Sequence, residues 1–353
     1  MNPVKKYSLS DFDYSLPNNL IAKYPARPRD SSRLFVVDTK KNVFYHDSFF
    51  NLDKYLSPHS LLVVNNTKVF HARLIAIREK DSKSFEFLLL HSSKKNHLIW
   101  NVLVSSLKRL KTGDLFKTTK NNFHFRFLAR KDDEGIIEFL EGNDPFDAME
   151  KEGMPPLPPY IDRDTTKKDI SYYQTIYAKE SGSSAAPTAG LHFTNRVFEK
   201  LENRKNIKTT FVTLHVGRGT FSPVRNEKLE MHNMHSEFYT ASKEACNRLN
   251  HQLKNNKDII SVGTTSLRTL ETIFNSNKNT FTPKAGETDI FIHPPMKIKS
   301  CNHMLTNFHL PKSTLLMLVC SFGGYDLIMK AYREAVKMKY RFYSYGDAML
   351  ILR

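Results

Sequence analysis

The sequence of 353 residues has few cysteines and no long apolar run, and these absences narrow its class. Cys246, Cys301 and Cys320 are far apart and odd in number, so they provide neither a disulfide framework nor a paired-cysteine metal site. The longest apolar run, residues 315–322, is too short to span a bilayer, and residues 1–10 contain no secretion signal. We therefore expect a soluble, cytoplasmic monomer with reduced thiols, no membrane association and no bound metal.

Three glycine-containing motifs of common enzyme classes are also absent. No G-x-G-x-x-G motif follows a strand-like segment, which removes support for a Rossmann cofactor loop and for the glycine-rich loop of a conventional methyltransferase. Without G-x-x-x-x-G-K-[ST] or G-x-S-x-G, a P-loop and a serine nucleophile elbow lack support as well.

Acidic residues are scarce relative to basic ones. Lys and Arg number 53 and Asp and Glu 36, a formal net charge of +17. The excess favours a polyanionic partner such as nucleic acid, although a lysine-rich proteome would give the same composition. Between residues 108 and 131 eight basic residues occur with one acidic residue. Within this stretch we assign RNA contacts to Lys108, Arg109 and Lys111.

Hydrophobic patterning divides the chain into two parts. Residues 72–142 contain short β-rich segments, and residues 123–127 alternate strictly, like a strand with one buried face. After a proline-rich connector at 155–160, strands and helices alternate. We predict an α/β fold: a large layered domain of residues 1–71 and 143–353, carrying an inserted small antiparallel β-barrel domain of residues 72–142.

The same patterns place individual elements in the larger domain. Helices are expected over residues 144–152, 194–204, 242–255, 265–274, 313–322 and 326–340. Strands are expected over residues 60–66, 207–216, 258–262, 289–293 and 345–352.

Two histidine-bearing turns are the main candidates for a site. Seven small residues or prolines precede Gly190-Leu191-His192, and His215 precedes a second glycine-containing turn at 217–221. Small side chains let a backbone approach a ligand, and each histidine is able to transfer a proton. Tight structural turns with surface histidines remain the alternative. In these turns we assign substrate contacts to Ala186, Thr188, Gly190, Arg218 and Thr220.

Residues 263–271 follow a predicted strand and open a helix. Free backbone N–H groups and the hydroxyls of Thr264 and Thr265 favour a carboxylate or phosphate. Arg268 and Glu271 share a helix face, so one charge of each sign is available for an amino-acid zwitterion. A capped helix with a surface salt bridge explains this segment equally well.

Three further segments combine histidine, carboxylate or aromatic residues. His235 and Glu237 share one face if extended, which suits acid–base work or a hydrogen bond to a base edge, but a third metal ligand is missing. Residues 305–311 and 340–349 mix aromatic residues with His or Arg, which suits stacking on a base or an ordinary core edge. Here we assign His309 and Tyr345 to substrate and Arg341 to RNA.

Taken in order, these motifs resemble the S-adenosylmethionine:tRNA ribosyltransferase-isomerase family of queuosine biosynthesis, from about Asp11 to Ile351. The resemblance is carried by Tyr24-Pro25, Ser32-Arg33-Leu34, Val64-Asn65-Asn66-Thr67, residues 154–161, 173–175, 185–193, 213–217, 219–221, 234–237, 263–266, 306–311 and 345–349. It implies an α/β domain with an inserted barrel and an enzyme without a metal. The implied reaction transfers the ribose of S-adenosylmethionine, a consumed co-substrate and not a cofactor, to 7-aminomethyl-7-deazaguanine at the tRNA wobble position. The implied products are epoxyqueuosine in tRNA, adenine and methionine.

This reaction needs a base for the carbon beside the sulfonium, an acid for the departing adenine and a neutral acceptor amine. From residue chemistry and motif position we expect His192 and His215 to transfer protons and Glu237 or Asp347 to hold the amine. Thr264, Thr265 and Arg268 are expected to bind methionine or a phosphate. Two rivals are a non-catalytic RNA-binding or ribosome-assembly protein and a conventional methyltransferase.

Overall fold

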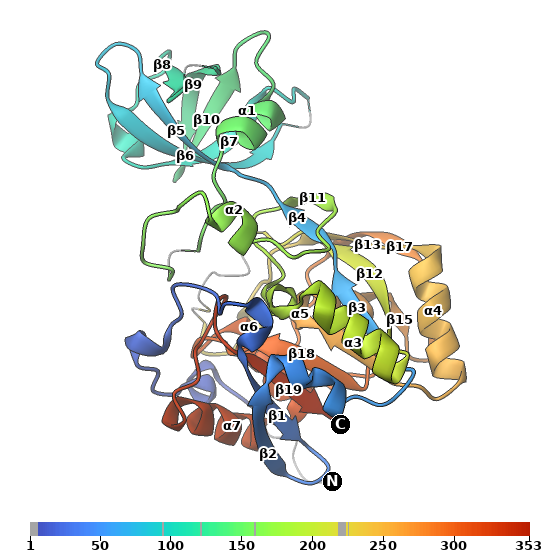
Figure 1. Cartoon of the computed structure of the whole chain (residues 1–353). Coiled ribbons are helices and arrows are strands. Elements are labelled where there is room, and N and C mark those ends of the chain that lie inside the picture. The colour runs from blue at the N-terminus through green and yellow to red at the C-terminus, as the bar shows by residue number, and fades with distance from the viewer. Residues whose placement is uncertain (1–5, 94, 121, 159, 218–223, 225) are drawn as a thin grey trace. The chain divides into compact units, whose positions relative to one another are not determined.

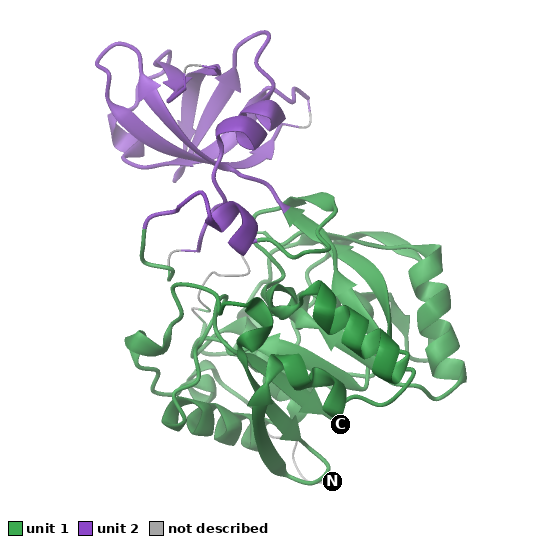
Figure 2. Ribbon diagram, in the orientation of Figure 1, with its two compact units in different colours: residues 1–68, 159–163, 174–353 green, residues 69–158, 164–173 purple. Residues whose placement is uncertain are grey.

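The computed structural model describes residues 6–93, 95–120, 122–158, 160–217, 224 and 226–353. The chain forms two compact units, shown in green and purple in Figure 2. The larger unit comprises residues 1–68, 159–163 and 174–353, and the barrel unit comprises residues 69–158 and 164–173.

A nine-stranded sheet organises the larger unit, in the order β17-β13-β12-β3-β14-β18-β19-β1-β2. Its strands are β1 Arg33–Asp38, β2 Val43–Ser48, β3 Leu61–Asn65, β12 Lys208–Leu214, β13 Glu237–Ala241, β14 Ile259–Val262, β17 Lys284–Thr288, β18 His303–Asn307 and β19 Ala348–Leu352. The central strands β3, β14 and β18 are buried at every position. The sequences of β3 and β14 are nearly continuously apolar, whereas β18 also buries His303, Thr306 and Asn307.

Four neighbouring strands, β12, β3, β14 and β18, run parallel to one another. Their carboxyl ends therefore meet at one edge of the sheet. The segments that leave this edge begin at His215, Asn66, Gly263 and Phe308. In open α/β sheets this edge is where ligands usually bind.

Helices surround the sheet (Figure 1). They are α3 Asn195–Lys205, α4 Lys243–Lys254, α5 Gly263–Ile273, α6 Thr314–Gly323 and α7 Tyr325–Lys337. Val197 and Leu201 of α3 pack with Leu62, Val64 and Ile260 of the sheet in one apolar cluster. Ser242 caps α4 by accepting a hydrogen bond from the Ala245 N–H at 3.1 Å, as its sequence predicts.

Short elements complete the larger unit. The 3-10 helices are η1 Leu9–Phe12, η2 Asn18–Leu20, η3 Arg29–Ser31, η4 Phe49–Lys54, η6 Thr188–His192 and η8 Leu229–Met231. Two small ladders pair β4 Thr67–Val69 with β11 Glu180–Ser183, and β15 Phe274–Asn275 with β16 Thr280–Phe281. In the described part of the chain no single helix has the length and apolarity to cross a membrane. Only α6 and α7 taken together, with a bend of 118° between them, meet those two criteria.

The barrel unit is a closed six-stranded antiparallel barrel in the order β10-β7-β6-β5-β8-β9. Its strands are β5 Arg73–Arg78, β6 Ser84–Ser92, β7 Ile99–Val104, β8 Leu115–Thr118, β9 His124–Lys131 and β10 Glu134–Phe139; η5 Leu107–Arg109, α1 Pro145–Glu152 and α2 Asp169–Tyr172 accompany them. Phe125 and Phe127 point into the barrel core, whereas Arg126 between them is exposed. The predicted alternation and the predicted fold class are confirmed.

One expected strand, residues 289–293, is wrong. The strand in this region is β17, and it ends at Thr288, which is paired with Glu237 at the first residue of β13. Beyond Thr288 the neighbouring strand supplies no partner, so the alternation of Ile290 and Ile292 reflects local burial without strand pairing.

Candidate functional site

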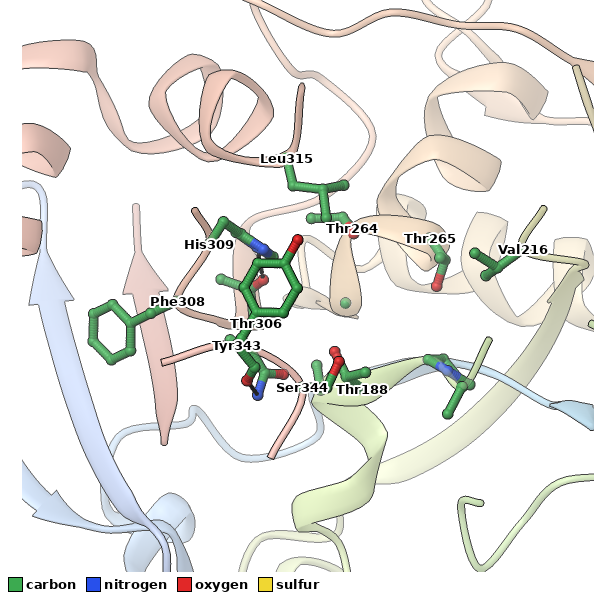
Figure 3. Close-up of a pocket in the computed structure, with 15 residues that line it drawn as sticks. Thr188, Val216, Thr264, Thr265, Thr306, Phe308, His309, Leu315, Tyr343 and Ser344 are labelled. Carbon is green, nitrogen blue, oxygen red and sulfur yellow. Dashed lines mark hydrogen bonds between the residues drawn. The ribbon is translucent and has the colours of Figure 1, made fainter. Parts of the chain in front are cut away.

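A pocket lies at the carboxyl edge of the parallel strands (Figure 3). Three segments form most of its wall: residues 186–189 entering η6, residues 263–265 at the start of α5, and residues 306–309 leaving β18. The remaining lining residues are Val216, Leu315, Tyr343 and Ser344. The pocket contains about 500 Å³ of empty space, part of it open to solvent.

Gly263 allows helix α5 to begin directly at the end of β14. Its φ of +89° is a conformation that favours glycine, which has no Cβ. The residue before it, Val262, provides no side-chain cap. The first N–H groups of a helix have no carbonyl partner within the helix, so α5 presents uncapped donors to the pocket.

The described residues of the pocket wall carry no acidic or strongly basic side chain. His309 is the one histidine among them, and burial lowers the pKa of its imidazole to about 3. The ring is therefore uncharged at pH 7, and its Nε2 atom lies 2.9 Å from Thr306 Oγ1. No described side chain in the wall carries a full charge, so the pocket suits a ligand group whose own charges sum to zero.

His192 lies behind this pocket, and it does not line it. Its Nδ1 atom is 2.8 Å from Ser32 Oγ, and its Nε2 atom is 3.3 Å from Asn307 Nδ2. Burial lowers the pKa of His192 to about 4, with Asp347 opposing that shift, so the imidazole is neutral at pH 7. Asn307 links the histidine to the pocket, because Asn307 belongs to the pocket wall.

Glu237 and Arg268 contact each other as a buried ion pair. Glu237 Oε1 also accepts a hydrogen bond from the Gly217 N–H at 2.8 Å. The Arg268 guanidinium donates to the carbonyl oxygens of Ile290 and Thr288, at 3.4 and 3.5 Å. Neither residue is part of the wall of this pocket, and Arg268, which we assigned to substrate, is paired with Glu237.

His215 lies in a second pocket. The chain continues to alternate after β12, so Val216 lines the first pocket while His215 and Thr213 line the second. His215 Nδ1 lies 2.8 Å from Thr67 Oγ1, and burial lowers the pKa of the ring while Glu180 opposes the shift. The structure therefore does not bring His192 and His215 into one cavity.

The Asp347 carboxylate connects two backbone segments by hydrogen bonds. Its carboxylate accepts hydrogen bonds from the N–H groups of Arg33 and Arg341, at 3.1 and 2.9 Å. The Arg341 guanidinium forms an ion pair with the same carboxylate at 2.9 Å. Arg341, expected to contact RNA, is only half-buried, but this pairing occupies it.

The other expected substrate residues divide between the pocket and its surroundings. Ala186, Thr188, Thr264, Thr265 and His309 line the pocket. Gly190 does not: a Cβ atom at this position would lie 2.0 Å from the Tyr177 hydroxyl, so the glycine makes room for packing. Tyr345 is buried outside the wall, and Arg218 and Thr220 lie outside the described residues.

Three of the four basic residues assigned to RNA, Lys108, Arg109 and Lys111, are exposed on the barrel unit. The backbone that carries them is held in place: Arg78 donates to the Arg109 carbonyl at 2.9 Å, and the Lys111 N–H donates to Asp114 at 3.0 Å. Arg78 and Asp114 themselves form a buried ion pair at 3.0 Å. The charged ends of Lys108, Arg109 and Lys111 thus project from a rigid turn.

Asn307 and Ser32 were not assigned a role from the sequence, although both lie in segments that carry the family resemblance. The available signal was a polar residue at the end of a strand whose centre, Met304-Leu305, is apolar. That position alone does not distinguish a ligand contact from a structural amide. Among the described residues no group of three or more His, Cys, Asp or Glu side chains is arranged to hold a metal ion.

A mixed α/β sheet with a pocket at the carboxyl edge of its parallel strands is typical of ligand-binding enzyme domains. Comparison with known proteins is more specific. The model of the queuosine biosynthesis protein family matches residues 9–351. The chain therefore belongs to this family, as the motifs predict.

Individual relatives agree over nearly the whole length. The S-adenosylmethionine:tRNA ribosyltransferase-isomerase of Sulfurihydrogenibium sp. is 46% identical over 344 residues, covering 98% of this chain and 99% of the relative. The enzyme of the same name from Thermoanaerobacter sp. is also 46% identical, covering 97% and 99%. The crystal structure of S-adenosylmethionine tRNA ribosyltransferase from Thermotoga maritima has a TM-score of 0.55 and 37% identity, covering 97% of this chain and all of that chain.

Proposed function

We propose that this protein transfers and isomerises the ribosyl group of S-adenosylmethionine onto 7-aminomethyl-7-deazaguanine at the tRNA wobble position. Epoxyqueuosine-tRNA, adenine and methionine are the products. The observation that carries the proposal is the 46% identity, over 98% of this chain, to a protein named for this class of reaction. A non-catalytic RNA-binding protein would need neither the uncapped start of α5 nor the neutral pocket beside it.

The chemistry begins at the sulfonium, whose positive charge acidifies the protons of the ribose 5′ carbon. A base removes one proton, adenine departs as the ring opens, and the RNA amine attacks. Methionine then leaves as the epoxide closes. The described wall combines the apolar side chains of Leu315 and Val216 with hydroxyl groups, and part of the pocket is open to solvent.

We propose that His192 acts on this reaction as a positioning residue. Its pKa of about 4 keeps the ring neutral, but its Nε2 atom is directed at Asn307 and not at the pocket space. Tyr343 O and His192 Nε2 both face the Asn307 amide nitrogen, so together they hold that side chain in one orientation. His215 remains a candidate for proton transfer from the second pocket.

The tRNA substrate supplies a large polyanion. We propose that the exposed cations Lys108, Arg109 and Lys111 of the barrel unit contact its phosphates. The wobble base is unpaired in the anticodon loop, so extruding it costs little.

Isotope transfer tests the reaction directly. The protein is incubated with precursor tRNA and S-adenosylmethionine labelled in the ribose in one sample and in the methyl group in another. We expect ribose label in the RNA, together with one adenine released per transfer. Methyl label in the RNA, with S-adenosylhomocysteine as product, would identify a conventional methyltransferase instead.

A further inference from the structure

Two buried oxygen atoms in the wall of the first pocket have no hydrogen-bond partner among the described residues: Asn307 Oδ1 and Thr265 Oγ1. Asn307 is 2% exposed and Thr265 is 7% exposed. A buried polar atom without a partner is destabilising, and a ligand group that reaches the atom removes this penalty. The two side chains come from β18 and α5, so the tertiary fold brings these unsatisfied atoms to one pocket.

Asn307 is oriented as a hydrogen-bond acceptor. Its amide nitrogen donates to the Tyr343 carbonyl at 3.0 Å, and this carbonyl is able only to accept. The same nitrogen lies 3.3 Å from His192 Nε2, which is therefore the unprotonated ring nitrogen, while Nδ1–H donates to Ser32 Oγ. With its nitrogen occupied, Asn307 has only the oxygen left for a ligand, and that oxygen requires a donor.

Thr265 and the start of α5 provide the opposite chemistry. α5 is eleven residues long, its first residues are buried, and the N-cap residue Val262 provides no side-chain cap. Uncapped N–H groups at the positive end of a helix favour a carboxylate, and the Thr265 hydroxyl adds one more donor. Figure 3 shows Thr264 and Thr265 on one side of the pocket and Thr188 and Ser344 on the other.

The donor and acceptor regions are neighbours in the sheet. β14 and β18 are adjacent and parallel, with Val262 opposite Leu305, so Gly263 and Thr306 leave the same edge side by side. Asn307 follows immediately. The described part of the wall is uncharged and offers donors for an anion beside an acceptor for a cation, which matches a zwitterion, whose net charge is zero.

We propose that this pocket binds the α-amino-acid head group of S-adenosylmethionine. The carboxylate receives hydrogen bonds from the α5 N-terminus and Thr265, and the ammonium donates to Asn307 Oδ1. His192 is a positioning residue that holds the Asn307 amide. The choice of ligand rests on the proposed function. The adenine ring fits this pocket less well, because it carries no anionic group for the α5 N-terminus.

Three ligands separate the parts of this site: S-adenosylmethionine, its decarboxylated analogue, which keeps the ammonium, and 5′-methylthioadenosine, which lacks the whole amino-acid group. Binding of each is measured by calorimetry to the wild type and to Thr265→Val, Asn307→Ala and Thr269→Val. Thr269→Val is the matched control. It removes a hydroxyl from the same helix, but this hydroxyl donates to the Thr265 carbonyl, and Thr269 does not line the pocket. Thermal unfolding reports whether each variant is folded.

Thr265→Val should weaken S-adenosylmethionine about tenfold and leave the decarboxylated analogue within about twofold. Asn307→Ala should weaken both of these ligands about tenfold or more and leave 5′-methylthioadenosine unchanged. Thr269→Val should change none of the three. If Thr265→Val and Asn307→Ala weaken 5′-methylthioadenosine as much as S-adenosylmethionine, the pocket binds the adenosyl group. If Thr265→Val weakens S-adenosylmethionine and its decarboxylated analogue equally, Thr265 does not contact the carboxylate. Either result overturns the proposal.

The isotope-transfer experiment on the wild type distinguishes a failure of this head-group site from a failure of the proposed function. If the wild type transfers ribose but the binding pattern is different, only the head-group site fails. If the pattern holds and no ribose is transferred, the head-group site stands and the proposed function fails.

Discussion

The two histidine-bearing turns look alike in the sequence, yet the structure gives them different surroundings. His192 is buried between Ser32 and Asn307, behind the first pocket. His215 is only partly buried, and its ring faces the second pocket next to Thr67 and Phe238. A histidine next to small residues thus leads to two different environments in this protein. The elements that pack against the imidazole decide whether it is buried and orients a neighbouring side chain, like His192, or lines an open pocket, like His215.

The largest expected effect comes from removing the buried member of this pair. His192→Ala deletes the acceptor that holds the Asn307 amide and leaves a cavity, so Asn307 is misplaced and adenine release should fall by about 100-fold. Binding of tRNA should stay close to that of the wild type. Adenine release followed by chromatography, with filter binding of tRNA, measures both. Unchanged turnover in this variant would remove His192 from the mechanism.

The two histidines should also differ in how they make stability depend on pH. The pKa of His192 is about 4 in the folded protein against an ordinary 6.5, so the unfolded chain binds a proton more readily between these values. Stability therefore falls as pH decreases from 6.5 towards 4, and His192 contributes up to about 3 kcal/mol of that loss. In His192→Gln the free energy of unfolding should depend less steeply on pH in this window. Denaturant unfolding at several pH values measures the slope, and an unchanged slope would contradict the assignment.

A second comparison is between the basic turn of the barrel unit and ordinary surface lysines. Changing Lys108, Arg109 and Lys111 together to Ala should weaken tRNA binding. It should also flatten the plot of log affinity against log salt concentration by roughly two to three units, since about three phosphate contacts are lost. Binding titrations at several salt concentrations measure the change.

A charge-matched control uses three exposed lysines on or just after α4 of the larger unit. Lys243, Lys254 and Lys257 are changed together to Ala. If both triple variants lose affinity equally, the barrel turn has no special role and the overall positive charge explains the binding.

The smallest effect is expected at the second pocket. His215→Gln leaves the first pocket and its unpaired atoms intact, so binding of S-adenosylmethionine should stay within about threefold of the wild type. Calorimetry measures this value, with Asn307→Ala as the sensitive reference. A tenfold loss in His215→Gln would show that the two pockets act as one site.

Much of the fold was predictable because its signals are local. The alternating phenylalanines around Arg126 predicted a barrel strand, and Ser242 predicted the start of α4. The expected strand at 289–293 failed because a strand needs a partner, and β13 begins at Glu237, opposite Thr288. No pattern within residues 289–293 records where the neighbouring strand starts.

The site was predictable in part, and the failures have one cause. Thr188, Thr264, Thr265 and His309 line the pocket as expected, since small or hydroxyl-bearing residues at strand ends commonly do. Arg268 was expected to bind methionine or a phosphate, and the fold places it against Glu237, which neutralises its charge. A sequence shows which residues are charged without showing which of them neutralise each other.

By itself, the sequence determined the family, the alternation of strands and helices, the barrel pattern and the glycine at which α5 begins, because each depends on residues that are close together in the chain. The tertiary structure alone decided which polar atoms remain unpaired. Asn307 and Thr265 lie 42 positions apart in the printed sequence. Their side-chain oxygens, which lack hydrogen-bond partners, come to the same pocket only because β18 lies beside β14 in the sheet. Hydrogen-bond satisfaction is a property of the assembled sheet, so it follows from packing and not from local pattern.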